Sequence, residues 1–340
     1  MIYQLNNQCF ALSIPPRIKI RGILETVMKI VFFGTPDYVV PIVNLLHKSF
    51  SDKTGKSAIL TVVTQKPKPY GRKQEKAYSP VDTWAYKKKI PVTYELAEIP
   101  FADLGVLAAY GEIIPDSVIR KFKFGILNIH PSLLPIYRGA SPIQAAIASM
   151  DKETGVTIIK IDSHMDHGPI IAQFKETISQ SDTLGSLRER LFARASEVLV
   201  SLIPPYLQSK IKLREQEHDG ASYTSLVKKE HGYISPAYLQ KTTTGKPISA
   251  KWIIPFIKDY SQKPSAQMLD AYIRALNPWP TAWSDVLLNP GGPSRRLKIL
   301  SAHIDSGPEN LLILDEVQLE GKNTVSFEEF KRGYPKASFV

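Results

Sequence analysis

The chain has 340 residues, a net charge of +11 at pH 7 and a single cysteine, Cys9. Apolar residues make up 43 % of it, which allows a packed core and argues against wholesale disorder. One cysteine excludes an internal disulfide and any metal site built from several thiolates. No apolar run approaches the roughly 20 residues that span a bilayer, so we expect a soluble, cytoplasmic protein with no membrane partner.

Residues 1–27 show no clear hydrophobic period, whereas Met28 opens an apolar run that reaches Gly34. We interpret 1–27 as an N-terminal extension that is not part of the fold. The alternative is a targeting peptide, because basic side chains in this stretch outnumber its one acidic side chain, Glu25. The stretch lacks a clear cleavage site, which favours the first interpretation.

The first half of the chain alternates strand-like and helix-like segments. The strand-like runs are apolar throughout and cover 29–33, 59–64, 104–108, 125–129 and 156–161. The helix-like runs are 38–47, 80–88, 117–121 and 142–149. Repeated βα units with strands buried on both faces predict an α/β fold with an open, mostly parallel, doubly wound sheet. Ligands are then expected beyond the carboxyl ends of the strands.

The second half adds a strand-like run at 170–178 and a long helix-like run at 183–202, which Pro204 and Pro205 are expected to end. Beyond about residue 233, short apolar runs separated by turn signals predict a small β barrel. The strand-like runs there are 297–300, 311–314 and 325–327. We therefore divide the chain into the extension, an α/β domain at 28–208, a linker at 209–232 and a C-terminal domain at 233–340.

Asn128 and His130 end one of the predicted strands. They are two residues apart, so their side chains share one face. A histidine can exchange protons near neutral pH, and an asparagine amide can donate a hydrogen bond to a developing oxyanion. The plainer alternative is a histidine that closes a loop through hydrogen bonds.

A second polar cluster, Asp162–Gly168, follows the strand-like run 156–161. If that strand ends beside the first, Asp166 or Asp162 would lie near His130. A carboxylate beside an imidazole favours the charged imidazolium and fixes its orientation. Asparagine, histidine and aspartate together form a cluster suited to acyl-type transfer.

Two further patterns suggest ligands. His164 and His167, with Asp166 between them, could hold a metal ion, although loop hydrogen bonding and solvent contact are the simpler roles. The turn Gly34–Asp37 precedes a helix and could hold an anion, or it could be only a tight strand-to-helix connection. It is not a dinucleotide-binding fingerprint.

Taken in order, these motifs resemble the signature of folate-dependent formyltransferases. The resemblance rests on Asn128-x-His130, on Asp166 lying 36 residues after His130 (166 − 130), and on the run Ser132–Pro135. It covers nearly everything from Met28 to the C-terminus. The other matching segments are Val31–Pro36, Thr64–Pro67 with Gly71-Arg72, Ala108–Gly111, Tyr137–Gln144, Met165–Pro169 and Asn277–Pro280.

The resemblance implies a Rossmann-like domain followed by an OB-like barrel that binds tRNA. It implies that a formyl group moves from 10-formyltetrahydrofolate, without a metal, to the amino group of methionine on initiator tRNA. By matching position, the catalytic residues are Asn128, His130 and Asp166. The implied folate-binding residues are Ser132, Leu133, Leu134, Pro135, Ala109, Tyr110, Gly111, His164 and Gly168.

Much of the positive charge lies between residues 66 and 89, where eight basic side chains are opposed only by Glu75 and Asp82. A basic loop beside the expected catalytic edge suits a phosphate-rich acceptor stem. A solvated charged face is the alternative. The resemblance places this loop at the acceptor end of the tRNA, and the implied tRNA-binding residues are Lys66, Lys68, Arg72, Lys73 and Lys76.

The chain departs from the family pattern at several places. The segment Lys73–Lys76 replaces a second glycine and a lysine pair, and His167 stands where a small residue is common. An apparent insertion covers about 237–255. Three other functions remain open, namely formyl transfer to an amino-sugar nucleotide, hydrolysis of the formyl folate, and RNA binding without catalysis. We expect a monomer.

Overall fold

The computed structural model describes residues 28–52, 54–70, 75–246 and 248–340. The predictions made for residues 1–27, Arg72 and Lys73 lie outside these ranges. The described chain divides into two compact units, each built from several stretches of sequence. Unit 1 contains the described residues up to 138 together with 155–176 and 188–221, and unit 2 contains 139–154, 177–187 and 222–340.

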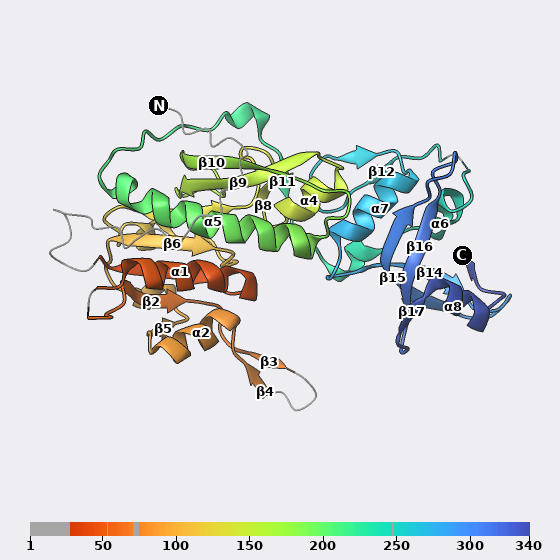
Figure 1. The fold of residues 1–340 in the computed structure, drawn as a ribbon, viewed down its shortest axis with the longest axis horizontal. Coiled ribbons are helices and arrows are strands. Elements are labelled where there is room, and N and C mark those ends of the chain that lie inside the picture. The colour runs from red at the N-terminus through yellow and green to blue at the C-terminus, as the bar shows by residue number, and fades with distance from the viewer. Residues whose placement is uncertain (1–27, 53, 71–74, 247) are drawn as a thin grey trace. The chain divides into compact units, whose positions relative to one another are not determined.

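Unit 1 is organised around a seven-stranded sheet with the order β10-β9-β7-β6-β1-β2-β5 (Figure 1). The strands from β5 through β2, β1 and β6 to β7 are parallel, and β9 pairs antiparallel with β7. The prediction of a mostly parallel α/β sheet is therefore confirmed. The strands are β1 Ile30–Gly34, β2 Ile59–Val63, β5 Val92–Thr93, β6 Leu104–Ala108, β7 Ile126–His130, β9 Glu153–Lys160 and β10 Ile170–Thr177.

The central strand β1 is apolar throughout because both faces of the sheet are covered there. Along β1, the four residues from Ile30 to Phe33 are all fully buried. Successive side chains point to opposite faces, so Val31 and Phe33 join a core cluster with Tyr110 and Phe122. A run buried on both faces gives the continuous apolar pattern that predicted the strand.

Helices and 3-10 turns connect the strands. They are η1 Asp37–Val39, α1 Val40–Phe50, α2 Pro80–Lys88, η2 Leu96–Glu98, α3 Asp116–Ile119 and, after β10, α5 Leu184–Leu207. In α2, Oγ of Ser79 accepts a hydrogen bond from Asp82 N and Pro80 occupies the first turn, so the sequence fixes its start. No described helix combines the length and apolar character needed to cross a bilayer.

Helix α5 runs past the residues that were expected to end it. Pro204 and Pro205 lie inside the helix, which continues to Leu207. The fixed φ angle of proline is compatible with an α-helix. A proline pair can therefore occupy the last turn of a helix where the loss of two backbone N–H donors is tolerated. The backbone N–H groups of Gln208 and Lys210 still bond to the carbonyl oxygens of the two prolines. The prediction of a helix end at the proline pair was therefore wrong.

Unit 2 contains a five-stranded antiparallel sheet with the order β17-β16-β15-β14-β18. Its strands are β14 Ala282–Leu287, β15 Ser294–Ile304, β16 Leu312–Leu319, β17 Thr324–Ser326 and β18 Ser338–Phe339. Its helices are α4 Pro142–Ala148, α6 Pro236–Thr242, α7 Ala266–Ala275 and α8 Phe327–Gly333. The antiparallel sheet agrees with the predicted β-rich C-terminal domain.

Short elements complete the structure. These are β3 Lys68–Tyr70 and β4 Glu75–Ala77, which form an antiparallel hairpin, and β12 Trp252–Ile253 and β13 Ser261–Gln262, which form another. The remaining ones are β8 Arg138–Gly139, β11 Tyr223–Thr224, η3 His218–Gly220 and η4 Lys229–Gly232. The predicted insertion at 237–255 contains most of α6 and all of β12.

Candidate active site

Strand β7 carries the first two candidate side chains of the site. Asn128 and His130 stand two residues apart at its carboxyl end, and both are buried, with 8 % and 4 % of their surface exposed. Because β7 runs parallel to β6, this end lies at the edge of the sheet where an open α/β fold binds its ligands.

Asp166 contacts both of them. Its Oδ1 accepts a hydrogen bond from Nδ2 of Asn128 at 3.1 Å, and its Oδ2 lies 3.5 Å from Nδ1 of His130. The Asp166 backbone adopts a left-handed φ of 50°, a conformation uncommon outside glycine and found often at functional sites. The structure therefore brings together the three side chains that the sequence singled out.

Asp166 arrives by a different route from the one expected. The expectation was that two neighbouring strands would end at the same edge of the sheet. Strand β9 is antiparallel to β7, with Lys160 beside Leu127 and Thr157 beside His130, so it ends next to the start of β7. The loop 161–169 then turns back and carries Asp166 to the other end of β7. An apolar pattern predicts a buried strand but not its direction.

The contacts of His130 define its proton arrangement. Nε2 lies 2.9 Å from the carbonyl oxygen of Tyr137, and a carbonyl only accepts, so Nε2 must carry a proton. Nδ1 then faces the Asp166 carboxylate. A second proton on Nδ1 would turn this approach into an ion pair with Asp166. One ring nitrogen of His130 therefore makes the loop-closing contact with Tyr137, and the other faces Asp166.

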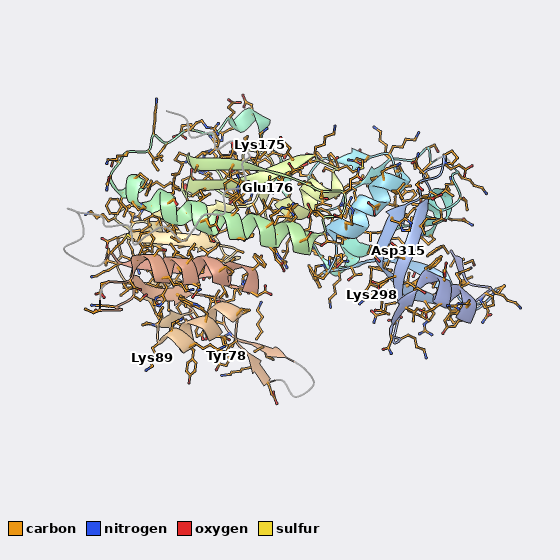
Figure 2. All side chains as sticks on the ribbon, in the orientation of Figure 1. Tyr78, Lys89, Lys175, Glu176, Lys298 and Asp315 are labelled. Atoms are coloured by element: carbon orange, nitrogen blue, oxygen red, sulfur yellow. The ribbon has the colours of Figure 1, made fainter. Side chains whose placement is uncertain are left out.

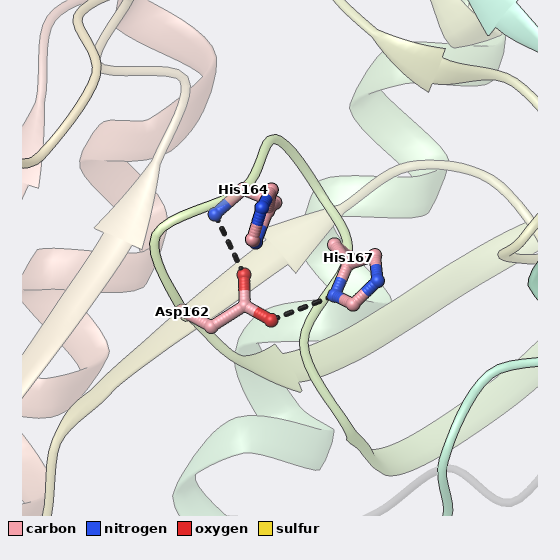
Figure 3. Close-up of side chains that lie close together, drawn as sticks. All are labelled: Asp162, His164 and His167. Atoms are coloured by element: carbon pink, nitrogen blue, oxygen red, sulfur yellow. Dashed lines mark hydrogen bonds and ion pairs between the residues drawn. The ribbon is translucent and has the colours of Figure 1, made fainter.

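The loop before Asp166 is organised by Asp162 (Figure 3). Its Oδ1 accepts from the backbone N–H of His164 at 2.9 Å, and its Oδ2 lies 2.7 Å from Nδ1 of His167. Partial burial raises the pKa of Asp162, but the hydrogen bonds to His167 and His164 outweigh it, so the pKa lies below its usual value. These contacts shape the loop that leads to the Asp166 carboxylate.

The same residues form the candidate metal group. Asp162, His164 and His167 offer ligand atoms that all lie within 4.8 Å of one another. The set differs from the predicted one, because Asp162 replaces Asp166, whose carboxylate faces Asn128 and His130. A metal ion would have to displace the hydrogen bond between Asp162 and His167. The ring of His167, where the family usually has a small residue, stacks on the ring of His218 with centroids 3.9 Å apart.

The segment Ser132–Pro135, implied to contact folate, is held by hydrogen bonds to its backbone. Oγ of Thr157 donates to Ser132 O at 2.7 Å and accepts from Leu134 N at 3.0 Å. Nε2 of Gln173 donates to Leu134 O at 3.0 Å. Ser132 and Leu134 are buried and Leu133 is half-buried, so this segment forms a firm wall beside His130.

The loop at Ala109–Gly111 faces the ends of β1 and β2. Ala109 and Gly111 have left-handed φ angles of 48° and 89°. Tyr110 is almost fully buried, and its ring packs on Phe33 with centroids 5.8 Å apart, so it can contact a ligand only through its backbone. Its carbonyl oxygen accepts from Nε2 of Gln65 at 3.3 Å. This loop therefore offers mainly backbone groups.

The basic segment 66–89 separates into two groups. Lys66, Lys68 and Lys76 are exposed at the β3–β4 hairpin, whose tip, including Arg72 and Lys73, lies outside the described residues. Lys87–Lys89 lie at the far end of α2, as the positions of Tyr78 and Lys89 show (Figure 2). Only the hairpin group stands at the ligand edge of the sheet. Of these, Lys66 pairs with Glu95 at 2.5 Å, which reduces the charge it offers.

Sequence reasoning missed several side chains that organise the site. Gln173 supports the Ser132–Pro135 wall, and Gln216 donates to the carbonyl oxygens of Asp166 and Gly168. Arg138 was noted only as part of a matching motif, yet it binds Oε1 of Gln216 at 2.6 Å. A weak signal existed in the alternation Arg214-x-Gln216-x-His218, which places polar side chains on one face of an extended segment.

Residues 28–203 match the formyl transferase family. The methionyl-tRNA formyltransferase of Methylacidiphilum infernorum is 33 % identical over 337 residues, covering 90 % of this chain and 95 % of its own. That of Wolbachia sp. subsp. Drosophila simulans is also 33 % identical and covers 92 % of this chain and 98 % of its own. Among solved structures, the methionyl-tRNA formyltransferase from Clostridium thermocellum has a TM-score of 0.51 at 20 % identity, covering 86 % of this chain and 98 % of its own.

A sugar 3N-formyl transferase, WlaRD, has a TM-score of 0.58 at 19 % identity, covering 88 % of this chain and all of its own. Likeness at this level of identity shows the fold, which sugar and tRNA enzymes share. Fold and site thus define the class, that of folate-dependent formyl transferases. Sequence identity over nearly the whole length is more specific than likeness of fold. On this ground the chain belongs to the methionyl-tRNA formyltransferase family.

Proposed function

We propose that this enzyme transfers a formyl group from 10-formyltetrahydrofolate to the amino group of methionine on initiator tRNA. The observation that carries the proposal is the contact of Asp166 with both Asn128 and His130 at the ligand edge of the sheet. It occurs in a chain that is one-third identical to methionyl-tRNA formyltransferases over nine-tenths of its length. The geometry of the site supports acyl-type transfer, and the identity of the acceptor is inferred from the relatives.

The neutral amine attacks the formyl carbon directly, forming a C–N bond and a tetrahedral oxyanion. The amide of Asn128 has a second N–H besides the one bonded to Asp166, and it donates to the oxyanion. Protonated His130 supplies positive charge from Nδ1, and Asp166 keeps it charged and oriented. The bond from the formyl carbon to the folate nitrogen then breaks, and the proton released by the amine passes, directly or through water, to that nitrogen.

The formyl folate is held by backbone groups on two sides in this proposal. One side is the wall Ser132–Pro135, and the other comprises Ala109–Gly111 and the loop from His164 to Gly168. The structure supports the fit, because these loops present carbonyl and N–H groups held in place by neighbouring side chains. A pteridine carries several donors and acceptors in its plane, so such an edge suits it. WlaRD was solved in the presence of 5-N-formyl-THF.

The tRNA is proposed to contact the β3–β4 hairpin and the C-terminal sheet. On the hairpin, Lys66, Lys68, Arg72, Lys73 and Lys76 contact phosphates of the acceptor stem. In unit 2, a hollow of about 330 Å³ is lined by three basic side chains, one acidic side chain and two uncharged residues, namely Arg296, Lys298, Lys322, Glu320, Gln318 and Gly321. Lys298 is labelled in Figure 2. Positive charge on an exposed sheet attracts a nucleic-acid backbone.

The domain division is kept as part of this proposal, with a catalytic domain at 28–208, a linker at 209–232 and a tRNA-binding domain at 233–340. The family match at 28–203 supports the first boundary. The five antiparallel strands of unit 2 support a β-rich second domain, and we propose that they form an OB-like barrel. A cytoplasmic location and a monomeric state also remain predictions, and size-exclusion chromatography with light scattering tests the second.

The test is an acceptor comparison. Purified full-length protein is mixed with 10-formyltetrahydrofolate and either methionyl initiator tRNA or a set of amino-sugar nucleotides. Formylated methionyl-tRNA is the expected product. Formylation of only a sugar nucleotide would replace this proposal with the sugar formyltransferase. Release of formate without an acceptor would indicate a hydrolase, and tRNA binding without turnover on any acceptor would indicate a non-catalytic RNA-binding protein.

A further inference from the structure

The catalytic loop is tied to a segment far along the chain. Nε2 of Gln216 donates to the carbonyl oxygen of Asp166 at 2.9 Å and to that of Gly168 at 2.8 Å. These two bonds hold the backbone on either side of His167. Gln216 lies in the stretch that the sequence predicted to be a linker, and it is buried, with 5 % of its surface exposed.

Gln216 is in turn fixed by Arg138. The guanidinium approaches Oε1 of Gln216 through Nη2 at 2.6 Å and through Nε at 3.2 Å, and Arg138 is 2 % exposed. A guanidinium only donates hydrogen bonds, so Oε1 must be the acceptor. The amide therefore has one permitted orientation, in which both N–H groups of Nε2 point at the catalytic loop.

The backbone of this segment is also anchored. Arg214 forms a pair of hydrogen bonds with Ile170 on β10, its N–H bonding to Ile170 O at 2.9 Å and its O accepting from Ile170 N at 2.7 Å. Two residues beyond Gln216, Nδ1 of His218 lies 2.8 Å from Nη2 of Arg138, and the His218 ring stacks on that of His167. Alternate side chains of one extended segment thus contact the site, which is what period-two geometry allows.

We propose that Gln216, oriented by Arg138, is a positioning residue that sets the Asp166 carboxylate against Asn128 and His130. The inference rests on the proposed function, in which Asp166 acts on the reacting centre. Asp166 holds a left-handed φ of 50°, which a free loop would seldom adopt. The two hydrogen bonds from Gln216 stabilise that backbone, so the carboxylate is in place before substrate arrives.

The decisive variant is Gln216→Glu. A glutamate keeps the shape and still accepts from Arg138, but it has no N–H group and directs an oxygen at two carbonyl oxygens. The folded core should survive, whereas the loop that carries Asp166 is released. Misplacing a catalytic group by about 1 Å typically lowers the rate by about 10²-fold. We expect kcat of Gln216→Glu to fall by about 10- to 100-fold, with KM for the tRNA within about threefold. KM for the formyl folate should rise, because the same loop lines its proposed site, and the protein should stay folded at the assay temperature. Gln180→Glu adds the same charge at an exposed site and should leave kcat unaltered.

A double-mutant cycle separates positioning from a general structural role. In the Asp166→Asn background, Gln216→Glu should have little further effect on kcat, because the group it positions is already gone. Multiplicative losses, or wild-type kcat in folded Gln216→Glu, would overturn the inference. If Gln216→Glu does not fold, Gln216→Met provides the same comparison, and full activity of that variant would equally overturn it. Wild-type turnover by Asp166→Asn would instead overturn the role proposed for Asp166, whereas a wild-type enzyme that does not formylate methionyl-tRNA would overturn the proposed function itself.

Discussion

His130 is oriented by a backbone carbonyl, with its Nε2 2.9 Å from the oxygen of Tyr137. Because that oxygen can only accept, the bond fixes a proton on Nε2 and leaves Nδ1 facing the carboxylate of Asp166. A main-chain partner cannot be lost by a change of side chain at residue 137. The orientation of the imidazole is thus set by the path of the chain between Ser132 and Arg138.

Removal of any member of the trio should abolish most turnover without unfolding the protein. We expect Asn128→Ala to lower kcat by about 10²–10³, the usual effect of losing one oxyanion donor. His130→Ala and Asp166→Ala should lower kcat at least as much. The first removes the proposed positive charge, and the second removes the carboxylate that orients it. Single-turnover formylation measures the loss, and circular dichroism checks the fold. An Asp166→Ala enzyme with normal turnover would contradict the assigned role.

Lysines of the hairpin should affect tRNA use and not folate binding. For Lys76→Ala we expect a higher KM for tRNA and a slope of log K against log salt that is smaller by about 1, as for one lost phosphate contact. Arg72→Ala should act in the same direction. Lys87→Ala, at the far end of α2, is the matched control, because it removes the same charge away from the site. Equal salt dependence in all three variants and the wild type would show that the hairpin does not contact RNA.

Gly168 has no room for a side chain. A Cβ at this position would lie 1.9 Å from the carbonyl oxygen of Lys160, so Gly168→Ala must displace backbone at the base of the catalytic loop. We expect a loss of about 1–3 kcal/mol in the free energy of unfolding, with weaker binding of the formyl folate. Gly333→Ala meets nothing within 4 Å and should be nearly neutral. Chemical denaturation measures the free energy of unfolding of both variants. Equal values would show that the loop can shift to accommodate a Cβ at residue 168.

His47 should make stability depend on pH. Partial burial, followed by the nearby charge of Lys88, lowers its pKa from the model-compound value of 6.5. Between that lowered pKa and 6.5 the unfolded chain binds more protons than the folded protein, so stability is fully present above pH 6.5 and declines as pH falls. His47→Gln should flatten this part of the profile. Above pH 6.5 the difference between the variant and the wild type should be independent of pH, and a slope unchanged by the substitution would exclude His47 as its source.

Turnover should not require a metal ion. Asp162 already uses one carboxylate oxygen on His164 and the other on His167, and the trio reaches its geometry without either histidine. Dialysis against a strong chelator is expected to leave kcat within about twofold of the untreated enzyme, since no step of the proposed reaction uses a metal. Loss of activity that zinc restores would show that the Asp162, His164 and His167 group holds a functional ion.

Sequence patterns predicted the parallel part of the sheet, the bounds of α2 and the candidate trio Asn128, His130 and Asp166. Strands such as β1 are buried on both faces and therefore carry a continuous apolar pattern, and α2 is bounded by Ser79 and Pro80. Asn128 and His130 could be placed together because their spacing of two puts them on one face of a strand. Each of these features depends on residues that are close together in the sequence, so a local sequence pattern is enough to predict it.

How Asp166 reaches the site, and what holds it there, became visible only in the folded chain. Strand β9 runs antiparallel to β7, and a buried strand has the same apolar pattern in either direction. Arg138 and Gln216 are 78 residues apart, so no local pattern pairs them. The basic side chains of 66–89 form one group in the sequence. In the structure, α2 separates those at the hairpin from Lys87–Lys89 at its far end. Contacts across long stretches of chain depend on how the elements pack, and that information is distributed over the whole sequence and not carried by any one motif.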